Sequence, residues 1–337
     1  MSSFAIRVPC SSANIGPGFD VIGLALSLHL ELRVTIDDSK PSSELPLNCA
    51  ITYEDQSKST ESISLDPEVN LITRVALYVL RCHNQRAFPV ETKVHIVNPI
   101  PLSRGLGSSG TAVVAGVMLG NEVGKLGLSK ERLLDYCLMI ERHPDNVAAS
   151  LFGGFVGTYL NELKPEDVAR KEIPLSEPPL GIGHYRKFDW APEIKAIAII
   201  PDFVVPTADA RNVLPQQYSR ADVVFNLQRA ALLPAALGTS PPDPEMIFLA
   251  MQDKVHQPYR KGLIPGLTEV LQSMTPATQP GLLGICLSGA GPTILALATD
   301  RFTEIADRII ARFATNNITC QWKLLEPAQE GTTVTPV

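Results

Sequence analysis

The sequence lacks the cysteine pairs that would indicate a metal or redox motif. Its six cysteines, at positions 10, 49, 82, 137, 286 and 320, include no C-x-x-C spacing. Buried, reduced thiols are therefore favoured over a zinc site or a disulfide framework. The N-terminal stretch 1–9 also lacks the apolar segment of a secretory signal. Both absences lead us to expect a cytoplasmic protein.

Charge is scarce, and its balance is acidic. Asp, Glu, Lys and Arg make up 19% of the chain, the net charge is −6 and the pI is about 5.6. A nucleic-acid surface would need a basic stripe, so we expect no nucleic-acid partner. A nucleotide remains compatible with this charge, because backbone N–H groups and a few local cations can hold phosphates.

One segment, residues 270–299, carries no charge at all. It is long enough to span a bilayer, but three prolines and several glycines interrupt it. Two buried strands joined by a glycine turn are the better interpretation, so we expect no membrane association.

Hydrophobic residues make up 45% of the 337 residues. Because one core stops growing at roughly 250–300 residues, two lobes are expected.

Hydrophobic spacing predicts strands and helices without strict βαβ alternation, which favours an α+β fold. The clearest strand is 24–36, where every even position is apolar. Residues 162–190 mix prolines with charges and are expected to link the lobes, which we place at residues 1–175 and 176–337. We expect the tail after Glu326 to be unstructured. Further strands are expected at 93–97, 194–200, 282–287, 293–298 and 318–324, and helices at 70–82, 108–123, 129–140, 221–233, 244–255 and 302–313.

The segment with the strongest chemical pattern is 100–111, I-P-L-S-R-G-L-G-S-S-G-T. Gly105 and Gly107 permit tight turns and close approach of the backbone to a ligand. Ser108 and Ser109 then open an apolar helix, whose N-terminus suits a polyphosphate. The segment is no Walker A loop, because no G-K-[ST] follows. An ordinary glycine turn before a buried helix is the alternative interpretation.

A second polar turn lies in residues 9–26, P-C-S-S-A-N-I-G-P-G-F-D-V-I-G-L-A-L. Asn14 and Asp20 flank its glycines, just before the long strand. A carboxylate there can accept hydrogen bonds from an ammonium group or a hydroxyl. Asn and Asp also stabilise turns without binding anything, and the residues alone leave these two interpretations about even.

A third polar group follows the helix predicted at 129–140, in the run E-R-H-P-D-N-V at 141–147. Proline disfavours a helical conformation in the preceding residue, so the helix should end here. Asp145 is a conceivable general base. It could equally cap the next helix, and His143 could be structural.

Four segments together resemble the homoserine kinases of the GHMP kinase superfamily. They are residues 9–26, the P-x-x-x-G-L-G-S-S loop 101–109, the run 141–147 and S-G-A-G-P-T at 288–293. The resemblance implies an N-terminal lobe like ribosomal protein S5 domain 2 and a ferredoxin-like C-terminal lobe, with the active site between them. A homodimer is a further expectation from the family.

The resemblance also implies an ATP and Mg²⁺ site. Magnesium would be held by Ser109 and by an acid on the following helix, which falls on Asp135. Many relatives have Glu there, so the shorter Asp makes direct ligation doubtful, and Glu141 is the fallback. The alternative for both Asp135 and Glu141 is a solvated carboxylate at the protein surface that binds no metal. The ATP-binding residues implied are Pro101, Arg104, Gly105, Leu106, Gly107, Ser108 and Ser109.

The substrate implied by the resemblance is L-homoserine, phosphorylated on its side-chain hydroxyl for threonine synthesis. Asn146 would bind the hydroxyl as a catalytic contact beside Ser109 and Asp135, and Asp145 would only orient. The hydroxyl proton would pass to the γ-phosphate or to a protein base. A sister kinase acting on mevalonate, or a non-catalytic GHMP-like binding protein, are the alternatives. The substrate-binding residues implied are Asn14, Asp20, Asn146, Thr207, Arg211 and Arg260.

Overall fold

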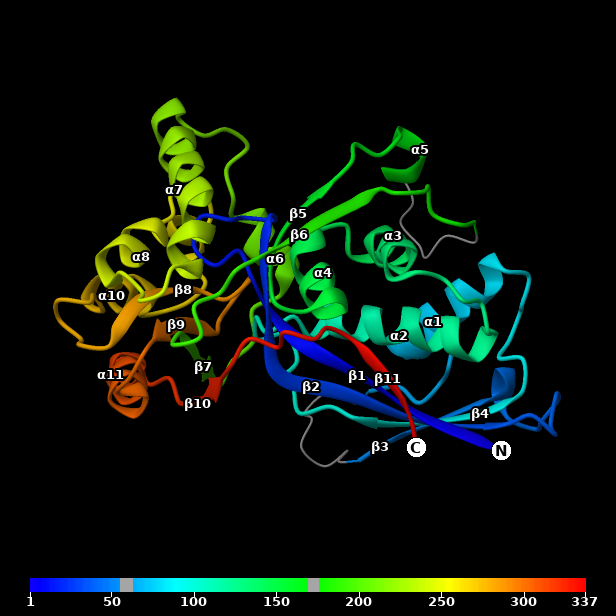
Figure 1. Cartoon of the computed structure of the whole chain (residues 1–337). Helices are drawn as coiled ribbons and strands as arrows, with labels where there is room; N and C mark the ends of the chain where they lie inside the picture. Colours follow the sequence, from blue (N-terminus) through cyan, green and yellow to red (C-terminus); the bar gives the residue numbers. More distant parts are fainter. Residues whose placement is uncertain (55–62, 169–175) are drawn as a thin grey trace.

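Two β-sheets organise the chain, one in each lobe, in a computed structural model that describes residues 1–54, 63–168 and 176–337 (Figure 1). The first sheet has seven strands in the order β11-β1-β2-β4-β3, with β5 paired to the start of β2 and β6 paired to β5. All pairs are antiparallel except β3–β4. The strands are β1 Ser2–Ala13, β2 Ile22–Asp37, β3 Cys49–Tyr53, β4 Glu91–Val97, β5 Phe155–Leu160, β6 Gly183–Phe188 and β11 Thr333–Pro336.

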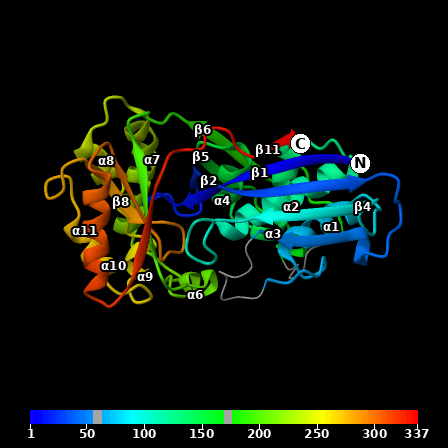
Figure 2. The same cartoon turned by 90° about the horizontal axis from the view of Figure 1, so that it is seen from below.

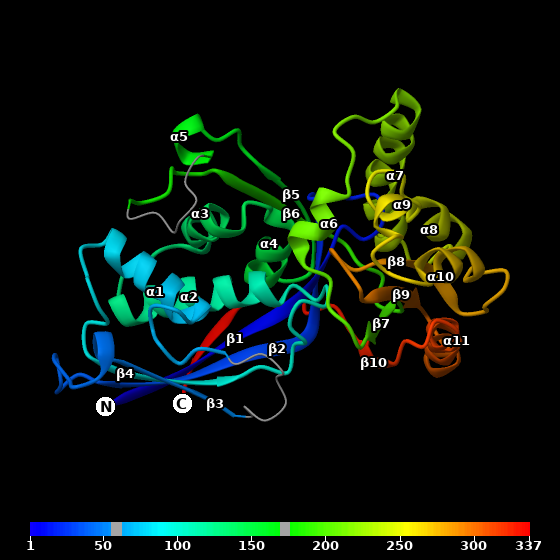
Figure 3. The ribbon, with the colours of Figure 1, turned by 180° about the vertical axis from the view of Figure 1, so that it is seen from behind.

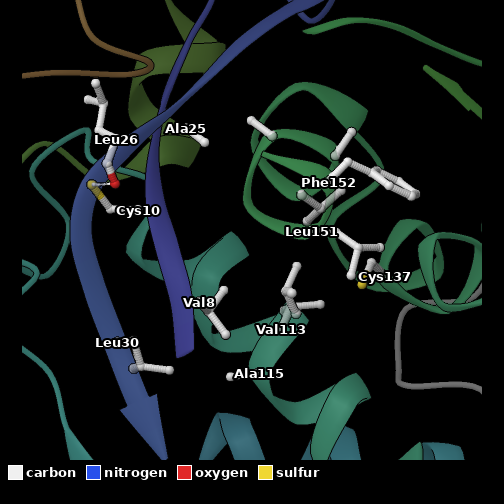
Figure 4. Close-up of a cluster of buried hydrophobic side chains, with 14 of the residues drawn as sticks. Val8, Cys10, Ala25, Leu26, Leu30, Val113, Ala115, Cys137, Leu151 and Phe152 are labelled. Atoms are coloured by element: carbon white, nitrogen blue, oxygen red, sulfur yellow. Dashed lines mark hydrogen bonds between the residues drawn. The ribbon is translucent and has the colours of Figure 1, made fainter. Parts of the chain in front are cut away.

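The alternation predicted for 24–36 is confirmed in β2. Its even positions from Leu30 to Ile36 are buried, because they face the helices that cover one side of the sheet. Nearer the start of β2 the two faces are exchanged, because a β-bulge interrupts the pairing with β1 between Pro9 and Cys10, and a Cβ at Gly23 would lie 3.1 Å from Ala149 on the helix side. Figure 4 shows side chains of β1 and β2 beside residues of these helices, such as Val113 and Leu151. The helices are α1 Leu71–Cys82, α2 Ser108–Gly124, α3 Lys130–Glu141 and α4 Pro144–Phe152, with short α5 Pro165–Val168 and η1 Pro46–Asn48.

Helices α1 and α2 pack closely because glycines of α2 face α1. A Cβ at Gly116 would lie 2.4 Å from the Ile72 carbonyl oxygen, and one at Gly120 would lie 2.8 Å from the Ala76 carbonyl oxygen. Ser129 caps α3 as predicted, since its side chain accepts a hydrogen bond from Arg132 N. The packing places the first turns of α2 and α4 at one end of the sheet, next to the second lobe (Figure 2).

The second lobe has an antiparallel sheet of order β10-β7-β9-β8. Helices separate β7 from β8, and α11 separates β9 from β10, which is the ferredoxin-like arrangement. Buried residues of α10 and α11 pack on one face, and those of α7 and α8 on the other (Figure 3). The elements are β7 Lys195–Pro201, α6 Thr207–Asn212, α7 Arg220–Gly238, α8 Pro244–Ala250, α9 Gln257–Arg260, α10 Leu267–Ser273, β8 Leu282–Leu287, β9 Ile294–Ala298, α11 Phe302–Ala314 and β10 Cys320–Leu325.

Two expectations about the irregular segments need correction. The tail after Glu326 is not unstructured, because β11 pairs with β1 and the Lys130 ammonium donates to Thr332 O at 2.8 Å. The expected linker 162–190 contains α5 and β6, and β6 belongs to the first sheet. The predicted division at 175/176 falls at the edge of residues outside the described part of the chain, and it stays a prediction.

The cysteines and the uncharged segment behave as expected. Cys10, Cys49, Cys137 and Cys286 are buried and unbridged, and burial raises the pKa of the Cys10 thiol to about 12. Residues 270–299 include the end of α10 and the antiparallel pair β8–β9. Within the described ranges, no helix combines the length and apolarity needed to cross a membrane.

Candidate active site

A cavity of about 460 Å³ lies where the two lobes meet. It is bounded by the turn between β1 and β2, the first turn of α2, the corner between α3 and α4, helices α6 and α9, and the glycine turn after β8. Pro101, Leu106 and Asp135 do not line it. The predicted site residues that do are Asn14, Asp20, Arg104, Gly105, Gly107, Ser108, Ser109, Asn146, Thr207, Arg211 and Arg260.

The glycine loop has the geometry expected of an anion-binding helix start. Gly107, the N-cap of α2, is left-handed with φ 65°, and Gly105 has φ 84°. A Cβ at Gly107 would lie 2.2 Å from Ser11 Oγ, so only glycine fits. Ser108 and Ser109 occupy the first turn of α2, where N–H groups have no partner within the helix. These groups face the cavity and can bind phosphate oxygens.

Hydrogen bonds join this loop to the distant glycine turn 288–293. Ser288 Oγ donates to Gly105 O at 2.6 Å and lies 2.7 Å from Ser12 Oγ, while Thr293 N donates to Arg104 O at 3.2 Å. The Arg104 guanidinium binds Pro201 O at 2.9 Å and Asp202 at 2.9 Å. Three of the four motifs that the sequence singled out therefore meet here, and Arg104 fastens the loop to the second lobe.

Glu141 is the acid at the phosphate loop. Ser109 Oγ donates to Glu141 Oε1, and His143 Nδ1 lies 3.7 Å from Glu141 Oε2. Burial lowers the pKa of His143, although Glu141 opposes the change. The Ser109 and Glu141 oxygens supply two hard donors of the kind that Mg²⁺ prefers.

Asp135, the acid expected to bind the metal, lies elsewhere. Its buried carboxylate accepts hydrogen bonds from Gly181 N and Ile182 N, both at 2.9 Å, and from Arg132 at 3.1 Å. It is six residues from Glu141 on α3, so the two carboxylates point to different sides of the helix. The structure does not bring Asp135 to the cavity, and Glu141 takes its place as the candidate metal ligand.

Asp20 and Arg211, which both line the cavity, form a two-point ion pair. Arg211 donates to the two Asp20 carboxylate oxygens at 3.0 and 2.7 Å. Asp20 is left-handed, with φ 56°, and Asn14 Oδ1 accepts from its N–H at 3.1 Å. Asn14 also donates to Gly289 O at 3.2 Å. Thr207 and Arg211 share the short helix α6, as the spacing predicts.

Arg260 is only 2% exposed and fixes the walls of the cavity. Its guanidinium donates to Ala210 O at 3.1 Å and to Gly289 O at 2.8 Å, so it joins α6 to the glycine turn. Burial, and then the nearby Arg211 charge, lower the pKa of Arg260 to about 10. It is a cation kept in place by backbone carbonyls beside a second cation, which suits an anionic ligand group.

Asn146 and Asp145 lie in the first turn of α4. Asn146 Oδ1 accepts from Ser11 Oγ at 2.9 Å, next to Gly107. His143 and not Asp145 occupies the N-cap position of α4; the carboxylate of Asp145, in the first turn, accepts from the adjacent Asn146 N at 2.8 Å. Burial, and then the Asp20 charge, raise the pKa of Asp145 to about 7. A carboxyl group with this pKa is able to exchange protons near neutral pH.

Sequence reasoning missed the apolar end of the cavity. Leu71 and Leu102 form part of its wall, and Asn70 donates to the Tyr53 hydroxyl at 2.9 Å. Tyr53 and Leu71 come from β3 and the start of α1, which carry no recognisable motif, while Leu102 is a variable position of the loop 101–109. Only the structure shows that they line the same cavity as the phosphate loop. The apolar and amphipathic lining residues contributed by these segments are Tyr53, Ile63, Leu71, Ile72 and Leu102.

The two-lobed fold and its phosphate loop define a kinase of the GHMP class. Residues 70–154 match the family model of the GHMP kinases N terminal domain, and residues 242–315 match that of the GHMP kinases C terminal domain. Homoserine kinase of Saccharomyces cerevisiae is 59% identical, with 98% of each chain covered, and that of Schizosaccharomyces pombe is 52% identical, with 99% of each covered. A crystal structure of homoserine kinase from Cytophaga hutchinsonii superposes with a TM-score of 0.77 at 28% identity, covering 99% of this chain and 98% of that one. The chain belongs to the homoserine kinase family of the GHMP kinases, as its motifs indicated.

Proposed function

We propose that the chain transfers the γ-phosphoryl group of ATP to the side-chain hydroxyl of L-homoserine, giving O-phospho-L-homoserine and ADP for threonine biosynthesis. One observation carries the proposal. A paired carboxylate and guanidinium, Asp20 and Arg211, line the same cavity as the phosphate loop. The names of the relatives described above agree with it.

The Asp20–Arg211 pair favours a zwitterionic substrate. An amino acid that enters between the two side chains replaces one ion pair with two, ammonium to Asp20 and carboxylate to Arg211, so neither charge is left unpaired. Mevalonate has a carboxylate but no ammonium, and would leave Asp20 without a cation. Sites built to pair a polar group can reject analogues that lack it by roughly 10⁴-fold or more. Thr207 and Arg260 complete the carboxylate side of this subsite.

ATP is proposed to lie along the glycine loop. The base would contact the apolar walls near Leu71 and Leu102, and the phosphates would accept hydrogen bonds from Ser108, Ser109 and the first N–H groups of α2. Ser109 and Glu141 would hold Mg²⁺, which when bound neutralises charge on the β- and γ-phosphates. Two protein oxygens are a usual number for magnesium, whose other ligands are phosphates and waters.

Asn146 would orient the hydroxyl, because it lines the cavity and its side chain is held by Ser11 next to Gly107 of the phosphate loop. Catalysis would then rest mainly on positioning and on charge stabilisation. We infer that the hydroxyl proton passes to the transferred phosphoryl group. Asp145 is the second candidate acceptor, favoured by its pKa of about 7. Single-turnover phosphorylation by a folded Asp145→Asn variant separates the two, and we expect it to persist.

The test of the function is a panel of alcohols. ADP release is measured with L-homoserine, mevalonate and galactose at equal ATP and magnesium, and phosphohomoserine is identified by mass spectrometry. Release with homoserine alone supports the proposal. If ADP were released only with another alcohol, the protein would be a sister kinase; if homoserine bound without any ADP release, it would be a non-catalytic binding protein.

We also propose that the protein is a homodimer in the cytoplasm. Sedimentation would test the dimer, and cell fractionation would test the location.

A further inference from the structure

A fully buried histidine, His256, lies directly behind the amino-acid end of the cavity. It precedes α9, has 0% of its surface exposed and does not itself line the cavity. Both ring nitrogens have a partner. Nε2 is 2.7 Å from Gly16 O, and Nδ1 is 3.0 Å from an N–H nitrogen of Arg260. Its ring also stacks on Phe19, with centroids 5.4 Å apart and planes inclined by 26°.

The partners fix the protonation state of this ring. An arginine has no acceptor, so Nδ1 must carry the lone pair, and a backbone carbonyl has no donor, so Nε2 must carry the hydrogen. Three charged groups face the ring: Arg260, Asp20 and Asp253, whose Oδ2 is 3.6 Å from Nε2. Asp253 is itself occupied by the N–H groups of His256 and Gln257, at 3.0 and 2.7 Å. Burial lowers the pKa of His256, which agrees with a neutral ring.

Each contact of His256 reaches an element of the substrate subsite. Gly16 belongs to the turn that carries Asn14 and Asp20, and that turn packs so tightly that a Cβ at Gly16 would lie 2.3 Å from Met251 O. Arg260 joins α6 to the glycine turn. Phe19 lies between Gly18 and Asp20, with the guanidinium carbons of Arg211 and Arg260 each 5.5 Å from its ring centroid.

We propose that His256 is a positioning residue that sets the relative placement of Asp20 and the two arginines through its hydrogen bonds to Gly16 and Arg260. The inference rests on the proposed function, because it assigns His256 to recognition of the amino acid. Within the described part of the chain, the side chain of His256 contacts Gly16, Phe19, Asp253 and Arg260, none of which belongs to the phosphate loop. Loss of the ring should therefore weaken homoserine binding and leave ATP binding unchanged.

Two substitutions separate the two hydrogen bonds. The Asn oxygen in His256→Asn can replace Nδ1 and keep an acceptor for Arg260, whereas the Gln amide in His256→Gln can replace Nε2 and keep a donor for Gly16. Each variant leaves one buried group without its partner, the Gly16 carbonyl in the first and an Arg260 N–H in the second. We expect each to raise the homoserine KM by roughly 5- to 100-fold, with the ATP KM within about twofold of wild type. His184→Gln on β6, outside the cavity, is the matched control and should change neither constant.

An unchanged homoserine KM in both folded variants would overturn the inference, as would an equal rise in both KM values. If neither variant folds, ¹⁵N NMR of the wild-type histidines decides the question. We expect a neutral His256 with hydrogen on Nε2 that shifts on titration with homoserine but not with ATP. A charged ring, or one that homoserine leaves unmoved, would refute the assignment. Absence of homoserine turnover in the wild type would instead sink the proposed function, and the titration would then use whichever alcohol is phosphorylated.

Discussion

Ser109 shows how much one hydroxyl can contribute at the residue scale. It lies in the first turn of α2 and donates to Glu141, in the position proposed for metal and phosphate. Ser109→Ala should lower kcat on the order of 10²–10³-fold, by analogy with removal of one charge-stabilising donor. Homoserine affinity should stay nearly constant, because the hydroxyl of Ser109 bonds to Glu141 and not to Asp20, Arg211 or Arg260. Steady-state kinetics at saturating magnesium test this, and near-normal turnover would contradict the role.

The two acids of α3 give a matched pair of substitutions. Glu141→Gln should raise the magnesium concentration needed for half-maximal rate, because one hard ligand loses its charge. Asp135→Asn should not, although it should destabilise the fold by about 1–3 kcal/mol, since the buried carboxylate satisfies two backbone N–H groups. Magnesium titrations and urea denaturation of both variants provide the comparison. If Asp135→Asn raised the magnesium requirement and Glu141→Gln did not, Asp135 would be the metal ligand.

Asp145 should make stability depend on pH. Its folded-state pKa of about 7 is above the ordinary 3.8, so the folded protein binds the extra proton between these values. The stabilisation is complete below about pH 4 and is lost as pH rises through 7. Asp145→Asn cannot ionise, so relative to wild type it should gain stability between pH 5 and 8, by at most about 4 kcal/mol. Urea denaturation at both pH values measures this, and parallel pH profiles would refute it.

The sequence predicted those residues of the site that form contiguous motifs. It did not predict which distant residues contact one another. The glycines and serines of the loop could be found because a tight turn before a helix needs those residue types in that order. Asp20 and Arg211 are 191 positions apart, and nothing in either local pattern indicates that they meet. The sequence did not single out His256, because a buried histidine becomes informative only when its two partners, here Gly16 and Arg260, are known.

At the scale of elements, β11 is the least expected feature and the easiest to test. It pairs with β1 over Phe4–Arg7, and the preceding Gly331 packs so closely that a Cβ would lie 2.2 Å from Leu151 O. Deletion of residues 332–337 should cost about 2 kcal/mol or more, from lost strand hydrogen bonds and the Lys130–Thr332 contact. Urea denaturation of the truncated chain measures the cost, and an unchanged midpoint would show that the strand adds nothing.

Period-two and helical spacing of hydrophobic residues predicted most elements. Such spacing arises when one face of a strand or helix packs against the core. The spacing identified β2, α1, α2, α3 and α11 within a few residues. It failed for β5, β6 and β11, and the last two are short strands with few fully buried side chains. Their pairing with β1 and β5 comes from backbone hydrogen bonds at the sheet edge, and a backbone partner leaves no trace in hydrophobic spacing.

At the scale of the molecule, one apolar core extends across both lobes. Leu233 of α7 and Leu295 of β9 belong to the same buried cluster as the residues between the first sheet and its helices. We therefore expect a single cooperative unfolding transition in urea, coincident by fluorescence and circular dichroism. Two separated transitions would show that the lobes are independent. By the same reasoning, residues 1–175 alone should not fold stably, because β6 and β11 would be missing from their sheet.

The pairing of β11 with β1 has a consequence for the order of the chain. Val337 N donates to Ser3 O at 3.1 Å, and both ends lie together, on the far side of the first lobe from the cavity (Figure 1). A linker of a few residues could join them without crossing the active site, which makes the backbone effectively a ring. New ends opened in the exposed connection between α7 and α8 would yield a circular permutant whose cavity is assembled from the same contacts in a different sequence order.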